Sequence, residues 1–248
     1  MKRILAVVLV AAFACLGALQ AAEEQAAKPV RTLFITGNDV GAHKWRETTP
    51  ALREQLEKSG RFAVKVSEDP NILESEDALE QYDLLILNYV QLKEPPISDK
   101  AKENLLEFVK DGKGLVSFHM SSSSWQDWEA WHDLVGRWWK FGTSGHGPRG
   151  VFKAQVVKEH AITRGVPKEF DVDDELYAKL LGEGEIDVLV SAYSDWSKKT
   201  EPLVFTLTPG KGRVVNYAFG HDVKALADPV LGRLWVQSAE WAATGDVK

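Results

Sequence analysis

Short apolar runs separated by amphipathic stretches make up the chain from residue 30 onward. Four runs in the first half are rich in apolar and β-branched residues and therefore predict strands: Val30–Thr36, Phe62–Val66, Tyr82–Tyr89 and Leu115–Phe118. The third contains Leu84–Leu87, which is apolar at every position, a pattern typical of a parallel strand covered on both faces. Together these runs predict a largely buried sheet.

Stretches with apolar residues at helical spacing lie between these runs. A first helix is expected to begin at Thr48 or Thr49, directly before Pro50, and to end at Gly60. Ser98 is expected to cap a second helix. Since strands alternate with helices, the pattern predicts an α/β fold, a three-layer and mostly parallel sheet with helices on both faces.

The second half of the chain predicts further strands and two helices. Residues 125–140 contain five tryptophans and are expected to form one helix, and residues 231–242 a closing amphipathic helix. Gly210-Lys-Gly212 predicts the turn of a hairpin. No repeat or low-complexity segment interrupts the chain, so residues 30–244 are expected to form one domain. The expected strands are residues 151–157, 187–192, 203–208 and 213–219.

Residues 1–22 have the composition of a secretory signal peptide. A basic pair precedes an apolar stretch, and small residues suited to cleavage follow it. Residues 23–29 would then be a polar tether, and the protein is expected to be secreted or periplasmic. A lipoprotein anchored at Cys15 is the alternative, although the residues before this cysteine form a poor lipobox.

Cys15 is the only cysteine, so cleavage of the signal would exclude disulfides, thiolate metal ligands and cysteine nucleophiles from the mature chain. The formal net charge of −6 and the pI near 5.6 argue against a nucleic-acid partner. Beyond the signal, no stretch approaches the ~18 apolar residues of a membrane span. The frames of serine hydrolases and nucleotide-binding loops are also absent, which disfavours both classes.

All six histidines lie at predicted strand ends, in loops or at helix starts. His43, His119 and His221 each follow a predicted strand. Parallel strands would bring all three to the carboxyl edge of the sheet, where open α/β sheets bind ligands. A neutral imidazole there can bind a metal or transfer a proton near neutral pH. Histidines hydrogen-bonded to loop carbonyls are the structural alternative.

A metal site at this edge would have to be assembled by the fold, because the sequence has no His-Glu-x-x-His motif. Histidines together with Glu175 or Asp222 would suit zinc or another divalent transition metal. Glu175 is alternatively a general base, a group that orients a sugar hydroxyl, or part of a solvated acidic helix start. We take His43, His119 and His221 as candidate metal ligands and, with Glu175, as candidate catalytic residues.

Five further residues are candidates for contact with a substrate. Exposed tryptophans beside polar loops often stack on sugar faces, whereas tryptophans spaced i, i+3, i+6 are more typical of a core. An arginine in a glycine-rich loop suits an anionic or hydroxyl group, or is an ordinary loop residue. We expect one candidate, His146, to lie on a lid over the site. The five are Trp45, Trp125, His146, Arg149 and Tyr177.

Several segments, in this order, resemble the ThuA (trehalose utilisation) family: Gly112–His119, the loop with His146, Glu159–Gly165, Asp174–Tyr177 and Gly210–Asp222. The resemblance covers nearly all of the mature chain and implies a class I glutamine amidotransferase-like fold, with a flavodoxin-like sheet. Amidotransferases of that superfamily carry a cysteine on the elbow that would lie near His119. The chain has none there, so this activity is not expected.

The ThuA family is associated with the catabolism of trehalose and related disaccharides, alongside dehydrogenases that make 3-keto sugars. The resemblance implies a secreted enzyme that acts on a disaccharide, a glycoside or a 3-keto sugar, with a small carbohydrate as its partner. Lys44 replaces the family's aspartate after His43, and Ala161 replaces the proline after His160. The alternatives are a non-catalytic carbohydrate-binding protein that uses the tryptophan-rich helix, or an interaction module. The sequence leaves the oligomeric state open.

Overall fold

The computed structural model describes residues 28–92 and 96–248. The predicted signal peptide and most of the predicted tether lie outside the described residues. Within these two segments, no helix combines the length and the apolar character needed to cross a membrane.

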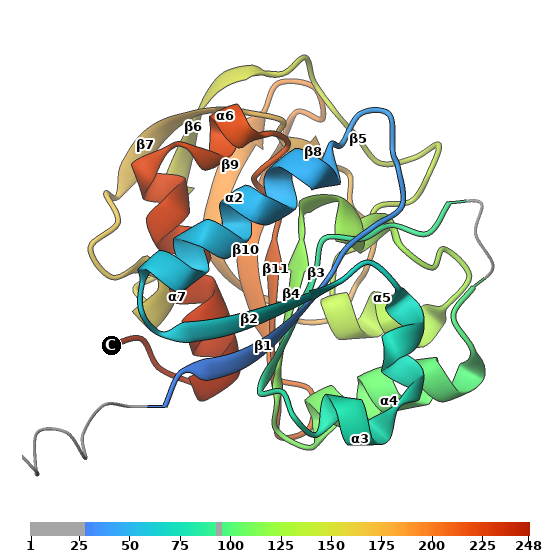
Figure 1. Ribbon diagram of the computed structural model, residues 1–248. Coiled ribbons are helices and arrows are strands. Elements are labelled where there is room, and N and C mark those ends of the chain that lie inside the picture. The colour runs from blue at the N-terminus through green and yellow to red at the C-terminus, as the bar shows by residue number, and fades with distance from the viewer. Residues whose placement is uncertain (1–27, 93–95) are drawn as a thin grey trace, which may run out of the picture.

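A mixed sheet runs through the described part of the molecule in the order β2-β1-β3-β4-β11-β10-β9-β6-β7 (Figure 1). The strands from β2 to β11 are mutually parallel, in the 2-1-3-4-5 order of flavodoxin-like sheets. They are β1 (Val30–Ile35), β2 (Phe62–Ser67), β3 (Leu84–Leu87), β4 (Gly114–Phe118) and β11 (Arg213–Tyr217).

The remaining strands continue the sheet in antiparallel pairs, beginning with the predicted hairpin between β10 and β11. A separate two-stranded ribbon, β5–β8, joins Gly145–His146 to Tyr177–Ala178. The antiparallel strands of the main sheet are β6 (Gly150–Val156), β7 (Glu169–Asp174), β9 (Asp187–Ser194) and β10 (Lys199–Leu207).

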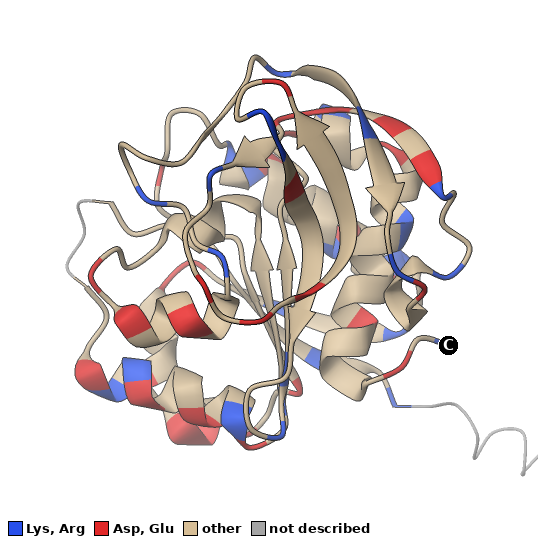
Figure 2. Cartoon of the chain, turned by 180° about the vertical axis from the view of Figure 1, so that it is seen from behind, with Lys and Arg blue, Asp and Glu red and all other residues tan. Residues whose placement is uncertain are grey.

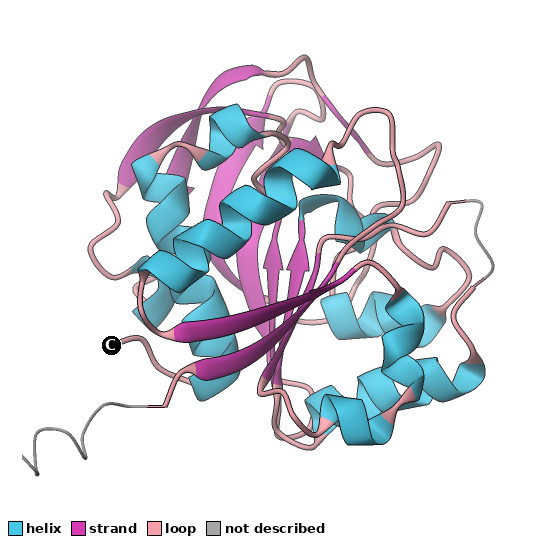
Figure 3. Ribbon diagram, viewed as in Figure 1, coloured by secondary structure: helices cyan, strands magenta, loops and turns pink. Residues whose placement is uncertain are grey.

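Helices cover both faces of the parallel strands, which confirms the predicted three-layer α/β fold (Figures 1 and 3). One face carries α2 (Trp45–Lys58), α6 (Val223–Leu226) and α7 (Pro229–Thr244). The other carries the 3-10 helix η1 (Pro70–Glu74) and the helices α3 (Glu76–Leu79), α4 (Asp99–Lys110) and α5 (Glu129–Val135). Ser98 caps α4 as predicted, since its side chain accepts the N–H of Ala101. Acidic and basic residues are interspersed on the helices (Figure 2).

Successive residues of the central strands alternate between two cores, one on each face of the sheet. Phe34 and Ile86 pack on the side of α2 and α7, whereas Leu33 and Leu85 pack on the side of α4 and α5. Burial of one such side chain stabilises a fold by ~1.5–3 kcal/mol. Because both faces are covered, these strands have no polar side, which is why they are continuous apolar runs in the sequence.

The helix α2 begins at Trp45, so the predicted start at Thr48 or Thr49 is wrong. Both threonines are buried within the helix, and their hydroxyls accept hydrogen bonds from the Asn88 amide at 3.1 and 3.0 Å instead of capping the helix. Pro50 therefore lies inside α2, where it lacks the N–H that would bond to the backbone four residues earlier.

The predicted tryptophan-rich helix over residues 125–140 is also wrong, since α5 spans only Glu129–Val135. Gly136 ends it with φ +72°, and Trp138 then pairs with Leu181 in an isolated bridge. The rings of Trp125 and Trp131 are buried, and their centroids lie 4.8 Å apart. The regular tryptophan spacing thus reflects packing into one core rather than a continuous helix.

Candidate functional site

Three histidines meet at the carboxyl edge of the parallel strands, as predicted. His43 lies in the loop after β1, His119 directly after β4, and His221 shortly after β11. The ring centroid of His43 is 5.0 Å from that of His119 and 4.9 Å from that of His221. The sheet order brings these loops together, because β1, β3, β4 and β11 are neighbours and point the same way.

His119 lies on a sharp elbow between β4 and a 3-10 helix, η2 (His119–Ser123). Its φ of +42° is in the left-handed region, which costs a non-glycine residue on the order of 1–2 kcal/mol. Nδ1 of His119 lies 2.7 Å from the carbonyl of Ala218, and the Tyr177 hydroxyl lies 2.9 Å from Nε2. The Ala218 carbonyl can only accept, so Nδ1 carries a proton, and in the neutral imidazole Nε2 offers its lone pair to the Tyr177 hydroxyl.

Glu175 is the carboxylate that the histidines share. Oε2 lies 3.1 Å from Nδ1 of His221 and 3.6 Å from Nε2 of His119, while Oε1 lies 3.3 Å from Nε2 of His146. Burial alone would raise the pKa of Glu175, but His119 and His221 hold it well below its usual value. The same carboxylate raises the pKa of His221 against the effect of burial. Glu175 is therefore charged and central to the site.

Asp174, which is not among the residues predicted for the site, holds Glu175 and His221 in place. Its buried carboxylate accepts the backbone N–H groups of Gly220 at 2.6 Å, Glu175 at 2.9 Å and His221 at 3.1 Å. It thereby ties the end of β7 to the turn after β11. Burial raises the pKa of Asp174 even though these hydrogen bonds favour its charged form. The acidic run around Glu175 was the available signal, but it did not distinguish Asp174 from Asp173.

His43 completes the cluster and is neutral at neutral pH. Burial, together with the positive charge that the neighbouring His119 and His221 can carry, lowers its pKa to about 3. No group in the described part of the chain hydrogen-bonds to its Nδ1, although this atom is buried. An unpaired buried nitrogen is costly, and such atoms occur at sites that take an ion or ligand.

Four residues offer ligand atoms that all lie within 4.8 Å of one another: His43, His119, Glu175 and His221. The three imidazoles and one carboxylate come from four separate segments of the chain. His146 is adjacent but is not one of the four. It lies on the β5–β8 ribbon, paired with Tyr177, instead of on a free lid.

A cavity of about 220 Å³ opens beside this cluster. His43, Glu175, Tyr177 and His146 give it one polar wall. Burial keeps the pKa of Tyr177 well above its usual value, so the phenol is a neutral donor. The volume is below the ~300–1,000 Å³ typical of drug-sized ligands, which suits one small ring. The remaining lining residues are Val40, Ala42, Val90, Leu92, Met120, Ser123, Trp139 and Phe141.

Three predicted substrate contacts do not line this cavity. Trp45 is 7% exposed and its indole N–H donates to Asp39, and Trp125 is 3% exposed within the tryptophan core. Arg149 binds carboxylates on both sides, at 2.9 Å to Asp173 and 3.1 Å to Asp222. It therefore braces the loop after His146 against β7 and the start of α6. Trp139 and Phe141 line the cavity in place of the predicted tryptophans.

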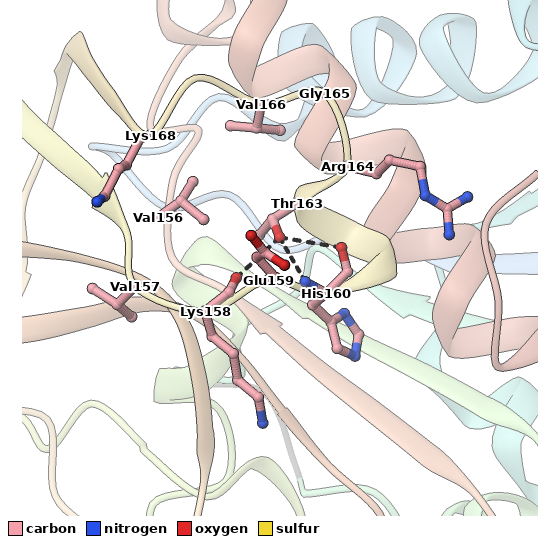
Figure 4. Close-up of a pocket in the computed structure, with 10 residues that line it drawn as sticks. All are labelled: Val156, Val157, Lys158, Glu159, His160, Thr163, Arg164, Gly165, Val166 and Lys168. Carbon is pink, nitrogen blue, oxygen red and sulfur yellow. Dashed lines mark hydrogen bonds between the residues drawn. The ribbon is translucent and has the colours of Figure 1, made fainter.

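A larger hollow of about 760 Å³ lies at the loop between β6 and β7, away from the histidine cluster. Figure 4 shows the side chains of Lys158, Arg164 and Lys168 pointing in different directions around it. His160 accepts the N–H of Ile162 at 3.2 Å and caps the 3-10 helix η3 (Ala161–Thr163). This segment is a capped turn, and its residues do not converge as the histidines at the sheet edge do.

Comparison with known proteins agrees with this fold. The family model for trehalose utilisation, ThuA, matches residues 31–242. A ThuA-like protein from Parabacteroides merdae ATCC 43184 is 28% identical with a TM-score of 0.79, over 89% of this chain and 92% of that one. A second, from Bacteroides uniformis ATCC 8492, is 18% identical with a TM-score of 0.71, over 89% and 94%.

A β-galactosidase from Rahnella sp. R3 shares the fold at 15% identity and a TM-score of 0.57, over 86% of this chain and 31% of that one. A search of curated proteins by sequence found no match.

Proposed function

The chain belongs to the trehalose utilisation (ThuA) family, and on this premise we propose that it acts on a disaccharide, a glycoside or a 3-keto sugar at the histidine site. The family makes a carbohydrate the expected substrate. The site would hold a divalent metal, with zinc as the first candidate. The observation that carries this proposal is the approach of four ligand atoms, from His43, His119, Glu175 and His221, to within 4.8 Å of one another.

The residues present fit a divalent cation. Three imidazoles and a carboxylate are donors that zinc and similar metals accept. A cation would satisfy the buried Nδ1 of His43, which no described group pairs. His119 donates from Nδ1 to a backbone carbonyl. This outer contact orients a ligating imidazole and leaves Nε2 for the metal. The negative charge of Glu175 offsets part of the charge of the ion.

The protein groups around the cluster would position the sugar. A bound metal would supply Lewis acidity toward a carbonyl or hydroxyl oxygen. The Tyr177 hydroxyl binds Nε2 of His119 in this structure. If the metal takes that nitrogen, the hydroxyl becomes free to donate to a substrate oxygen. His146 lies at the mouth of the cavity, with its imidazole 34% exposed, where it can exchange a proton with a substrate.

The apolar part of the cavity suits one face of a sugar ring. Trp139 and Phe141 line it together with Met120 and Val90. Aromatic and aliphatic walls exclude water and pack against C–H groups, while the polar wall binds hydroxyl or carbonyl oxygens. Since the cavity has room for about one ring, the second ring of a disaccharide would extend outward past Phe141, which is 50% exposed.

Metal analysis of the purified protein, followed by a turnover screen of 3-keto disaccharides with and without a chelator, tests this proposal. We expect about one tightly bound divalent ion per chain, as in other His-rich sites. Turnover should stop on chelation and return when the metal is restored. The variant His43→Ala should lose the ion, whereas His132→Ala, which changes a histidine in α5, should keep it. A chain that binds no divalent metal, or whose turnover ignores the chelator, would contradict the proposal.

The site is proposed to work outside the cytoplasm, in line with the signal peptide expected in residues 1–22. Cell fractionation and N-terminal sequencing of the mature protein test this expectation. The unprocessed chain found only in the cytoplasmic fraction would contradict it.

A further inference from the structure

A groove of about 350 Å³ lies on the outer side of the β5–β8 ribbon, and the mechanism above makes no use of it. The ribbon separates it from the histidine cavity. Glu175 and Tyr177 line the cavity, whereas Leu176 between them lines the groove. We call it the outer groove and define it by Gly147, Pro148, Phe152, Leu176, Tyr193 and Trp196.

Two aromatic side chains of the outer groove are open to solvent, and one of them, Trp196, is held in place by its neighbours. Tyr193 is 57% exposed and Trp196 is 43% exposed, although large aromatics are usually buried. The Lys179 ammonium lies over the Trp196 ring, 4.1 Å from its centroid. The ring also packs so tightly against Gly145 that a Cβ there would come within 2.6 Å of it. Trp196 is therefore positioned before any ligand arrives, which lowers the entropy cost of binding.

The polar groups of the outer groove suit a neutral ligand rich in hydroxyls. Asp195, between the two aromatics in the sequence, has a carboxylate that is 93% exposed; one oxygen accepts from the Lys198 ammonium at 3.3 Å, and the carboxylate can accept further hydrogen bonds at the rim. Phe152 and Leu176 supply apolar surface. Aromatic rings beside a carboxylate match the C–H faces and the hydroxyl edges of a sugar.

We propose that the outer groove is a second carbohydrate-binding site, which holds a neutral sugar ring between Tyr193 and Trp196, separately from the histidine cavity. The choice of a sugar as the occupant rests on the proposed function. Because the ribbon also carries His146 and Tyr177, the groove would hold a saccharide next to the reactive site. The competing occupant is a second copy of the chain that covers the two aromatics, and the experiment below distinguishes it from a sugar.

Titration of the ¹⁵N-labelled protein with trehalose, maltose and cellobiose tests the proposal. The indole N–H signal of Trp196, identified from its loss in Trp196→Phe, reports on the outer groove. We expect at least one of these sugars to shift this signal in the unmodified protein and equally in His119→Ala. Tyr193→Ala removes one stacking ring and should therefore raise the dissociation constant by at least ~10-fold. Val157→Ala, which removes an exposed apolar group elsewhere, should leave it unchanged.

Three outcomes would overturn the proposal. The first is that none of the sugars shifts the Trp196 signal, and the second is that Tyr193→Ala binds as tightly as the unmodified protein. The third is a concentration-dependent dimer that Tyr193→Ala abolishes, which would assign the outer groove to a second copy of the chain. The His119→Ala variant separates the two proposals. If it loses the metal and turnover but keeps the sugar-induced shift of the Trp196 signal, the histidine site and the outer groove act independently.

Discussion

Two histidines that each follow a strand differ in their surroundings. His119 lies at the carboxyl edge of the parallel strands, and His160 lies in the loop between β6 and β7. His119 contacts the carbonyl of Ala218 and the hydroxyl of Tyr177, which are 99 and 58 positions away in the sequence. His160 instead accepts the N–H of Ile162, two positions away, and caps its own turn. The hydrogen bonds of His119 therefore join distant segments of an assembled site, whereas the hydrogen bond of His160 stabilises its own turn.

The largest difference between the two regions is expected in activity. His119→Ala should lower turnover of the active sugar by at least ~100-fold, because it removes a metal ligand or acid–base group that typically contributes ~10²–10⁴. His160→Ala, which removes a helix cap and a ring contact with Trp241, should leave turnover within about 2-fold while it lowers stability by at least ~1 kcal/mol. Steady-state kinetics on both variants, with circular dichroism to verify folding, provides the measurement. Equal activity of His119→Ala and the unmodified protein would remove His119 from the site.

The fold class and the meeting of three histidines were predictable from the sequence. Continuous apolar runs indicate strands covered on both faces, and parallel strands bring the residues that follow them to one edge. His43, His119 and His221 needed only this argument. Their distances from one another did not follow from it, because spacing along the chain does not fix the conformation of a loop.

Other parts of the site were not predictable from local pattern. The sequence around Trp45 and Trp125 does not reveal whether these side chains are buried or exposed. Only the packing of α5 against the sheet places Trp125 in a core. Asp174 differs from Asp173 only in the direction of its side chain, which alternates along β7. His146 is held by a two-residue ribbon that is too short to leave a periodic signal.

The two regions should also differ in how much stability is lost when a side chain that accepts backbone hydrogen bonds is removed. Asp174→Ala leaves three backbone N–H groups without their acceptor, two of them, those of Gly220 and His221, at the turn after β11. We expect a loss of at least ~2 kcal/mol in the free energy of unfolding. Thr163→Ala, which removes the matching cap bond in the His160 turn, should cost ~1 kcal/mol. Urea unfolding measures both, and a smaller loss for Asp174→Ala than for Thr163→Ala would contradict this ranking.

Backbone conformation gives a finer test, in which the order of two substitutions should reverse. His119 has φ +42°, so His119→Gly should be more stable than His119→Ala by ~1 kcal/mol, since glycine adopts this region without strain. His132 lies inside the helix α5, where glycine is unfavourable. His132→Gly should therefore be less stable than His132→Ala by ~0.5–1 kcal/mol. Both pairs can be compared by thermal unfolding in the presence of a chelator. The same order at both positions would mean that the elbow at His119 is not strained.

The smallest effect concerns pH at His160. Burial lowers the pKa of His160 below the ordinary value of 6.5, so the folded chain disfavours its protonated form. As the pH falls through 6.5, the unfolded chain takes up this proton more readily, and the free energy of unfolding decreases. Protonation of Nδ1 would also end its acceptance of the Ile162 N–H. His160→Asn keeps a capping acceptor but cannot titrate, so its stability should decrease less between about pH 7.5 and pH 5.0. Urea unfolding at both pH values provides the measurement, and identical pH dependence in the two proteins would show that His160 titrates alike in the folded and unfolded chains.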